Sequence, residues 1–400
     1  MKTFYAMDPE IRSYFNRFTK DELMTILSYF EQACPKKAKK VELVDMVTAF
    51  IGGNPREWLY RLPERDLRTM RDIADAGPEN WVRMDSPEYP SVAALLGLIY
   101  IDDNSFDDIM TSMDFSLFFP VASIIDQVIA EKERDGSFRT ERSALGILNI
   151  YGAVPVEEFV EKVFDMYDED GSGKDVTLAM AECPVVSMNR VFYNDNFYII
   201  SPYAYDYENI IDGRKDFKEI KEYRMFTKED ALNAGTGSPY CAFRNQEYYA
   251  ARDVLEALGY EGKEIEEEIH SIWLNSQHAA NESAAEAIFS CVNSKIDDIE
   301  SFDLYRRYVD VIAAYANSVP KWLLKGETSS EAGLLQLSIK IDESVMEGNN
   351  LEEEAVLEQE LGPLKEYYRY NMAVRHVGPD DPCPCGSGLS YCRCHGKRLS

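Results

Sequence analysis

Apolar residues recur at helical spacing along most of the chain, which predicts a mainly α-helical protein. Thr19 and Glu22 have the spacing of a capping box and mark the start of a first helix, which Pro35 ends. A second helix closes at Gly52-Gly53. The apolar positions that define the faces of these two helices are Leu23, Ile26, Leu27 and Phe30, then Leu43, Val44, Val47 and Phe50.

The same periodicity predicts further helices over residues 55–75 and 90–101, and two more between 107 and 133. Residues 206–250 are rich in tyrosine and charge and carry no clear period. Helical spacing resumes at about Glu247 and continues to about Arg375. Within that region, Trp322 is expected in a core, and Thr328 with Glu331 has the form of a capping box.

A different pattern follows the boundary at Asp135-Gly136-Ser137. Three short helices precede two runs of β-branched and aromatic residues, which flank the three-residue turn Asn194-Asp195-Asn196 and predict a hairpin. Three helices and a hairpin are the order of a winged helix, although small α+β modules without a nucleic-acid ligand share it. The predicted helices and strands cover residues 144–148, 155–167, 176–182, 190–193 and 197–200.

These patterns predict a mainly α fold in several domains, with a small winged-helix-like α+β block in the middle and a metal-binding tail. The breaks in the pattern divide the chain into four parts. They are a helical N-terminal domain at 1–134, the α+β block at 135–205, a mainly helical domain at 206–375, and a linker with the tail at 376–400.

The chain is strongly acidic, with 71 Asp and Glu against 42 Lys and Arg and a net charge of −29 over 400 residues. A surface of that sign repels nucleic-acid backbones and anionic membranes, so nucleic acid requires a local basic patch. The first 62 residues are the only sizeable stretch without a negative net charge, since ten bases and eight acids give them +2. The most apolar stretch, Val92–Ile101, is about half of the roughly 20 residues that a membrane span needs.

The eight cysteines are unevenly placed. Four are isolated and four lie within twelve residues near the C-terminus. That distribution indicates one metal site in a reducing compartment and not a disulfide framework. The first 20 residues lack the apolar core of a signal peptide, so we expect a cytoplasmic protein that does not enter a membrane.

The clustered cysteines form the most specific motif of the chain. One residue separates Cys383 from Cys385, and eight residues intervene between Cys385 and the adjacent pair Cys394-His395. Gly386 and Gly388 allow the intervening chain to turn back tightly. Three thiolates and one imidazole make a closed tetrahedral set, which predicts one structural Zn²⁺ and argues against metal catalysis.

This tail resembles the SEC-C motif, a zinc-binding segment best known at the C-terminus of the SecA translocation ATPase. The resemblance covers about 20 residues and implies the zinc ligands Cys383, Cys385, Cys394 and His395. The family's Lys pair is replaced by Leu389-Ser390, and Cys392 is an alternative fifth ligand that is able to displace His395. The shared residues are Asp381, Pro382, Cys383, Pro384, Cys385, Gly386, Ser387, Gly388, Tyr391, Cys394, His395 and Gly396.

A second, smaller resemblance concerns residues 19–51, which are similar to SAP-like and Rho N-terminal-like modules. Those modules are helix–loop–helix units, many of which contact nucleic acid. Four lysines of the loop are candidate phosphate contacts that position a backbone without reading sequence: Lys36, Lys37, Lys39 and Lys40. The competing interpretation is a plain helical hairpin with a soluble loop. In the winged-helix-like block, the predicted third helix at 176–182 has no Lys or Arg, and Arg190 of the hairpin is a lone base.

The sequence therefore favours a non-enzymatic binding protein that docks through its zinc tail on a protein or ribosomal partner. The SEC-C resemblance implies a chaperone or the ribosome as the partner class. The residues expected to contact the partner are Tyr391, Arg393, Lys397 and Arg398. A nucleic-acid-associated regulator is the alternative, and an enzyme is a third, although no nucleophile elbow, phosphate loop or dinucleotide fingerprint is present in the sequence.

Overall fold

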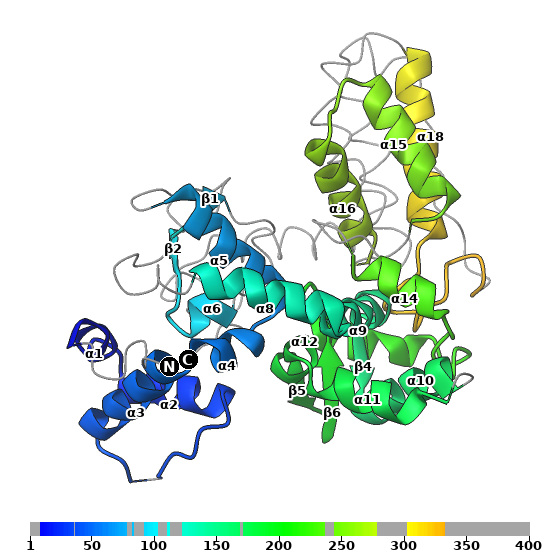
Figure 1. The fold of residues 1–400 in the computed structure, drawn as a ribbon. Coiled ribbons are helices and arrows are strands. Elements are labelled where there is room, and N and C mark those ends of the chain that lie inside the picture. The colour runs from blue at the N-terminus through cyan, green and yellow to red at the C-terminus, as the bar shows by residue number, and fades with distance from the viewer. Residues whose placement is uncertain are drawn as a thin grey trace, which may run out of the picture. The chain divides into compact units, whose positions relative to one another are not determined.

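A computed structural model describes residues 9–35, 37–77, 82–83, 92–102, 110–112, 122–168, 171–236, 244–277 and 302–332. These parts of the chain are mainly helical, as predicted, and add two small antiparallel sheets (Figure 1). The chain divides into two compact units, residues 1–243 and residues 244–400.

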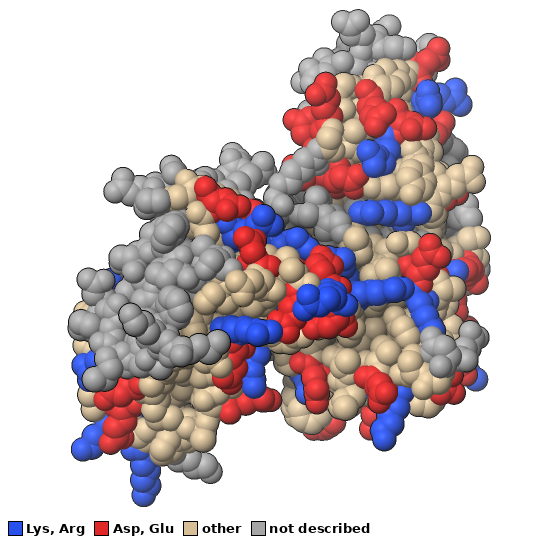
Figure 2. All heavy atoms as spheres, in the orientation of Figure 1, with Lys and Arg blue, Asp and Glu red and all other residues tan. Residues whose placement is uncertain are grey.

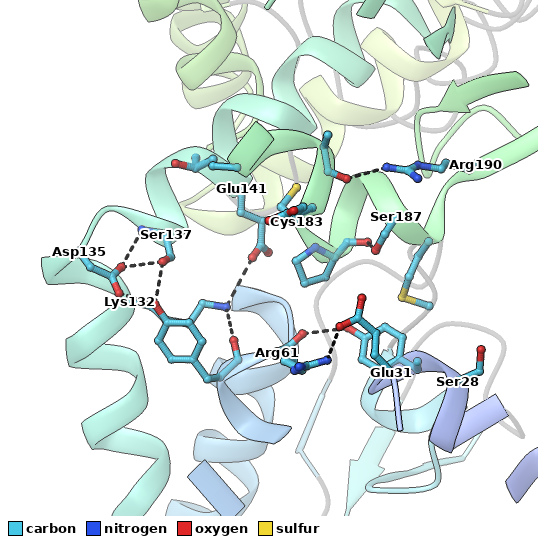
Figure 3. A pocket seen from close by; sticks show the side chains of 18 residues that line it. Ser28, Glu31, Arg61, Lys132, Asp135, Ser137, Glu141, Cys183, Ser187 and Arg190 are labelled. Atoms are coloured by element: carbon cyan, nitrogen blue, oxygen red, sulfur yellow. Dashed lines mark hydrogen bonds and ion pairs between the residues drawn. The ribbon is translucent and has the colours of Figure 1, made fainter. Parts of the chain in front are cut away.

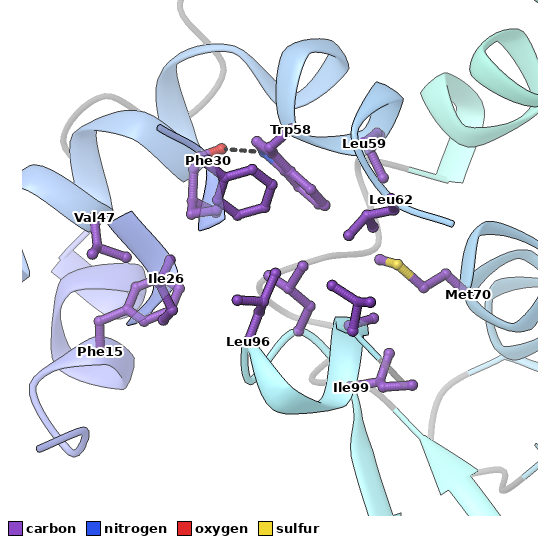
Figure 4. Packing of buried hydrophobic residues seen from close by; sticks show 14 of the residues in the cluster. Phe15, Ile26, Phe30, Val47, Trp58, Leu59, Leu62, Met70, Leu96 and Ile99 are labelled. Carbon is purple, nitrogen blue, oxygen red and sulfur yellow. Dashed lines mark hydrogen bonds between the residues drawn. The ribbon is translucent and has the colours of Figure 1, made fainter. Parts of the chain in front are cut away.

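The first unit begins with a layer of helices whose apolar faces meet in one core. Capping boxes set their starts: the hydroxyl of Thr19 accepts from the Glu22 amide at 3.3 Å, and the Glu22 carboxylate accepts from the Thr19 amide at 2.6 Å. Trp58 is buried and its indole N–H donates to the carbonyl of Ile51 at 2.9 Å (Figure 4). The helices are α1 (Pro9–Phe15), α2 (Lys20–Tyr29), α3 (Lys40–Gly53), α4 (Pro55–Tyr60) and α5 (Glu64–Ala76).

The two predicted helices and their apolar faces are confirmed, since every apolar position named for α2 and α3 is buried except Phe50, which is partly buried. The end predicted at Pro35 is wrong, because α2 already ends at Tyr29 and Glu31 adopts φ 54° just beyond it. The helix predicted over 55–75 is wrong in one respect. The segment forms two helices, α4 and α5, because Pro63 has no N–H to donate and would break the hydrogen-bonded ladder of a continuous helix.

The helix predicted over 90–101 is also wrong at its C-terminal end. Helix α6 (Val92–Leu95) stops where Gly97 adopts φ +69°, and strand β2 (Tyr100–Asp102) follows. A Cβ at Gly97 would lie 2.3 Å from the Phe18 ring, so only glycine fits there. Strand β2 pairs with β3 (Met110–Ser112), which pairs with β1 (Val82–Arg83). Of two helices expected between 107 and 133, the described residues hold α8 (Ala122–Arg134).

The middle of the unit follows the predicted order of helices and hairpin. Its elements are α9 (Ser137–Tyr151), β4 (Ala153–Pro155), α10 (Val156–Asp168), α11 (Gly173–Glu182), α12 (Pro184–Met188), β5 (Arg190–Tyr193) and β6 (Asn196–Ile200). The antiparallel sheet has the order β4-β6-β5. The buried residues of these elements form a second core, beneath α9 and α10.

The hairpin β5–β6 is confirmed, but its turn has two residues and not the predicted three. Asn196 belongs to the strand because it pairs with Tyr193. Asn194 and Asp195 both have positive φ, 47° and 60°. That is the geometry of a type I′ turn, whose twist matches the strands, and Asn and Asp adopt it at low cost.

Residues 206–236, which carry no clear period, form α13 (Tyr207–Gly213), the short 3₁₀ helix η2 (Arg214–Asp216) and α14 (Lys228–Ala234). Helix α14 crosses α9 at backbone contact, where Gly146 faces the carbonyl of Ala231 and Gly235 faces the carbonyl of Arg142. The guanidinium of Arg214 fastens α9 to β4 by donating to the carbonyls of Tyr151 (2.7 Å) and Ala153 (2.6 Å).

The second unit is described by α15 (Gln246–Ala257), α16 (Lys263–Gln277) and α18 (Phe302–Ser318), followed by a turn-rich segment. Trp322 is fully buried and packs edge-on against Trp273, as predicted for a core residue. The capping box of Thr328 and Glu331 is also formed, with the Thr328 amide 2.9 Å from the Glu331 carboxylate. Across all described segments, every helix is too short or too polar to cross a bilayer.

Candidate functional site

The predicted zinc ligands and partner-contact residues lie outside the described residues. They are Cys383, Cys385, Cys392, Cys394 and His395, with Tyr391, Arg393, Lys397 and Arg398. Within the described segments, no group of three or more His, Cys, Asp or Glu is close enough to hold a metal ion. Cys34 and Cys183 are free thiols in those segments.

The lysine loop is partly described. Lys37, Lys39 and Lys40 are exposed where α2 connects to α3, while Lys36 lies outside the described residues. The backbone N–H of Lys39 donates to the Glu42 carboxylate at 2.7 Å, which caps α3 and places an acid beside the lysines. Figure 2 shows basic and acidic side chains interspersed on this part of the surface. The structure thus brings the lysines together on a surface of mixed charge.

The aromatic residues near this loop are not free to stack on bases. Phe30 is fully buried, and Tyr29 is half-buried with its hydroxyl donating to the Arg61 carbonyl at 2.9 Å. Burial also raises the pKa of Tyr29 well above its usual range. A platform for single-stranded nucleic acid needs exposed rings. The loop therefore offers charge without stacking.

The α+β block at residues 135–205, predicted to be winged-helix-like, presents little positive charge. The exposed positions of α11 include Lys174, Asp175, Leu178 and Glu182. The guanidinium of Arg190, the lone base of the hairpin, donates to the carbonyl of Ala181 at 2.7 Å and thereby holds β5 against α11. A groove-reading helix carries donors for phosphates and base edges. This face has one exposed base against two acids.

A concave site lies inside the first unit. A cavity of about 860 Å³ lies where α2 and α4 meet the α8–α9 turn and the segment around α12 (Figure 3). Charged and polar side chains in its lining come from seven elements or their ends, spread between residues 31 and 190. These lining residues are Glu31, Tyr60, Arg61, Lys132, Asp135, Glu141, Glu182, Cys183, Ser187 and Arg190.

Lys132 and Glu141 form a buried ion pair in the wall of this cavity, with 3.9 Å between ammonium and carboxylate. The ammonium also donates to the carbonyls of Tyr60 (3.2 Å) and Leu62 (2.8 Å), at the end of α4. The carboxylate accepts from the amide of Glu64 (2.8 Å), the first residue of α5. The pair therefore satisfies backbone groups at a helix end and a helix start, which is a structural use of both charges.

Burial dominates the electrostatics of this pair. It raises the pKa of Glu141 to about 7 and lowers the pKa of Lys132 below its ordinary value. Burial also raises the pKa of the Cys183 thiol to about 12. A thiol with that pKa stays protonated at neutral pH and is a poor nucleophile.

A second polar group of the cavity, at the α8–α9 turn, is also committed to structure. The carboxylate of Asp135 accepts from the amide (2.9 Å) and the hydroxyl (2.6 Å) of Ser137, and from the Tyr60 hydroxyl. Although burial acts in the opposite direction, these hydrogen bonds lower the pKa of Asp135. Arg61 donates to the Phe30 carbonyl and to Glu31 at the rim. Lys132, Glu141, Asp135 and Arg61 are thus each paired or bound to backbone, which suits a joint between helices better than a nucleophile with its base.

This cavity was not predicted from the sequence. Its buried charges come from helices whose local pattern does not distinguish Lys132 and Glu141 from solvent-facing charges. The one available signal was the position of Glu141 among the apolar residues of α9, four residues before Leu145.

Comparison with known proteins finds that part of the chain is similar to SecA proteins. The protein translocase subunit SecA of Cupriavidus taiwanensis is 32% identical over 111 residues, and that of Ralstonia nicotianae is 29% identical over 120 residues. Each match covers 24% of this chain and 12% of the relative, so the chain spans about an eighth of the SecA proteins that it matches. No family model matches the chain, and no solved structure matches it.

Proposed function

We propose that this chain is a non-enzymatic binding protein that docks on a protein or ribosomal partner through a zinc-bound SEC-C tail. Cys383, Cys385, Cys394 and His395 hold one structural Zn²⁺. The ion folds a segment that is too short to build its own core. The protein acts in the cytoplasm, where reducing conditions keep the clustered thiols available.

The observation that carries this proposal is the ligand spacing of the tail, with two glycines between the Cys383–Cys385 pair and Cys394-His395. The similarity of part of the chain to a protein translocase subunit is in keeping with it. The contact residues of this proposal are Tyr391, Arg393, Lys397 and Arg398. The two basic residues at the end suit an acidic or RNA-bearing surface.

Zinc content tests the ligand set. Wild-type chain purified under reducing conditions is expected to retain about one zinc ion after dialysis, because four protein ligands complete the coordination of a structural Zn²⁺. C385S and C394S are expected to lose it, whereas C34S, at a thiol distant in sequence, serves as the matched control. Comparing C392S with H395A identifies the fourth ligand, since only the true ligand's removal releases zinc. Full zinc in C385S and C394S contradicts the proposal.

Docking is tested with purified ribosomes in a pelleting assay. Wild type is expected to co-sediment, and C385S and a K397A/R398A variant are expected to remain in the supernatant. Zinc removal by a chelator should have the effect of C385S, since metal and fold of the tail are coupled. If zinc-free and zinc-loaded chains sediment equally, the tail is not the docking element.

A nucleic-acid-associated function is the second candidate. A strand after the first helix, a hairpin after the later helices and the sheet order β4-β6-β5 favour it, because a winged helix has that arrangement. In this case Lys36, Lys37, Lys39 and Lys40 neutralise phosphates. Salt-dependent binding to a generic duplex, reduced when these four lysines are replaced by alanine, supports the regulator. A control that replaces the exposed Lys20, Lys174, Lys215 and Lys218 removes equal charge elsewhere, and equal loss in both variants contradicts a specific role of the loop.

A further inference from the structure

Exposed apolar side chains concentrate in the middle block of the first unit. Of nine large apolar side chains that are exposed in the described part of the chain, five come from residues 153–200. They are Val160, Phe164, Leu178, Phe192 and Phe197, with exposed fractions between 39% and 61%. Such a concentration marks an interaction surface more often than an accident of folding.

Helix α10 carries two of these five side chains. Its inner side buries Phe159, Val163 and Met166 in the second core. Its outer side exposes Val160 and Phe164, which are one turn apart and so lie next to each other along the helix. A row of exposed acids runs beside this apolar pair at positions 157, 161, 165 and 168. The outer side of α10 is thus amphipathic in its own right.

The charge on this face has one sign. Its acids are Glu157, Glu161, Asp165 and Asp168, and the one base of the helix, Lys162, is buried. The wider block at 135–205 has twelve acids and five bases, so its average field is negative as well. The neighbouring bases lie at the C-terminal end of the helix: Lys228 stands over the Tyr167 ring at 4.9 Å, and Lys174 begins α11.

We propose that the outer face of α10 binds a basic amphipathic helix of a partner protein. Apolar residues of the partner helix cover Val160 and Phe164, and its Lys and Arg residues meet the row of acids. A nucleic acid is disfavoured, because four carboxylates repel a phosphate backbone. A second copy of this face is disfavoured for the same reason, since it would place acids against acids.

This binding mode gives the winged-helix-like block a protein ligand and does not depend on the zinc tail. The block keeps helix order and hairpin but presents acids and apolar side chains on its surface. C385S, which tests the tail, should therefore leave binding at α10 unchanged. The two proposals stand or fall separately.

The test uses the full chain and a fluorescent model peptide of about 18 residues, built from Leu and Lys at amphipathic helical spacing. Wild type is expected to bind it in fluorescence anisotropy and to bind a scrambled peptide of equal composition about tenfold more weakly. V160S/F164S is expected to weaken binding of the amphipathic peptide by about tenfold, because two apolar anchors are lost. E161Q/D165N should weaken it severalfold and flatten its salt dependence.

Two control variants separate this site from the general attraction of a chain with charge −29 for any basic peptide. D303N/D310N removes two exposed acids of α18, and V41S removes an exposed apolar side chain of α3. Both are expected to bind as wild type does. Equal binding of amphipathic and scrambled peptides, or equal loss in the α10 variants and their controls, overturns the proposal. Unchanged far-UV circular dichroism and unfolding midpoints confirm that V160S/F164S is folded.

Discussion

Gly146→Ala is the single-methyl change with the clearest structural consequence. Gly146 lies in α9 where α14 crosses it, and a Cβ built on Gly146 would stand 1.7 Å from the carbonyl oxygen of Ala231. Ordinary contact begins at 3.4 Å, so the two helices have to move apart by about 1.7 Å to admit the methyl group. The obstacle is backbone and not a flexible side chain, so local rotation cannot relieve it.

That separation breaks a buried polar link as well as apolar packing. The Asn149 amide donates to the Ala234 carbonyl at 3.0 Å, and its oxygen accepts from the Ser201 hydroxyl at 2.9 Å. Overpacking costs about 1–3 kcal/mol. A buried amide left without its partner costs about 1–3 kcal/mol more. We therefore expect a loss of about 2–6 kcal/mol in the unfolding free energy of the first unit, a large share of a typical domain's stability.

Urea unfolding of the intact chain, with hydrogen exchange of the α9 and α14 amides, measures this loss. The midpoint of the first unit should fall by about 1–3 M urea, and exchange of both helices should accelerate together. Gly53→Ala is the matched control, because a Cβ there meets nothing within 4 Å and it is expected to be neutral or stabilising. Adding Gly235→Ala to Gly146→Ala should cost less than it does alone, since both sites share one crossing. A loss of less than about 1 kcal/mol for Gly146→Ala refutes the backbone contact.

Three further changes test the buried charges and the hairpin. Burial raises the pKa of Glu141 from 4.5 to about 7, so the folded state binds more protons than the unfolded state and the unfolding free energy falls as pH rises from 4.5 to 7. Glu141→Gln should flatten this slope in urea unfolding. Parallel pH profiles of the variant and the wild type contradict the prediction. Burial lowers the pKa of Lys321 from 10.5 to about 7, so the unfolded state binds more protons than the folded state and the unfolding free energy of the second unit should rise between pH 7 and 10.5. Lys321→Met should abolish this rise. A rise that persists in the variant shows that another group causes it. Asp195 has φ +60°, which glycine adopts without strain and a β-branched residue does not. In thermal unfolding, Asp195→Gly should change stability by less than about 1 kcal/mol, because relief at positive φ is offset by the larger entropy of glycine in the unfolded chain. Asp195→Val should destabilise by about 1–2 kcal/mol, and a valine variant more stable than the glycine variant contradicts the type I′ turn.

Much of the fold could be predicted because its signals are local. The Thr19–Glu22 and Thr328–Glu331 capping boxes each span three residues, and both are formed. The apolar faces of α2 and α3 and the pairing of β5 with β6 also depend on spacings of a few residues. The errors include the end of α6 at Gly97, the break at Pro63 and the length of the hairpin turn. The first two lie at residues that break helices, so the sequence did carry a local signal for them.

The tail motif was likewise within reach of the sequence, since its four expected ligands, Cys383, Cys385, Cys394 and His395, lie within thirteen residues. Metal ligands that are close in sequence can be predicted from their spacing, because a short loop closes at low entropic cost. The acidic row of α10 was also present as a pattern of residues. Its exposure was not, because periodicity separates two sides of a helix but does not say what covers them.

Only the tertiary structure decided which charges are buried and which backbones touch. Glu141 meets the amide of Glu64 across 77 positions of sequence, and Gly146 meets the Ala231 carbonyl across 85. Lys321 likewise donates to the carbonyl of Ser276, 45 residues earlier. A hydrophobic pattern records which side of a helix faces inward, since that depends on residues three and four apart. Which helix lies opposite depends on how the whole set of faces packs, and that packing sets burial, the pKa of Glu141 and the space at Gly146.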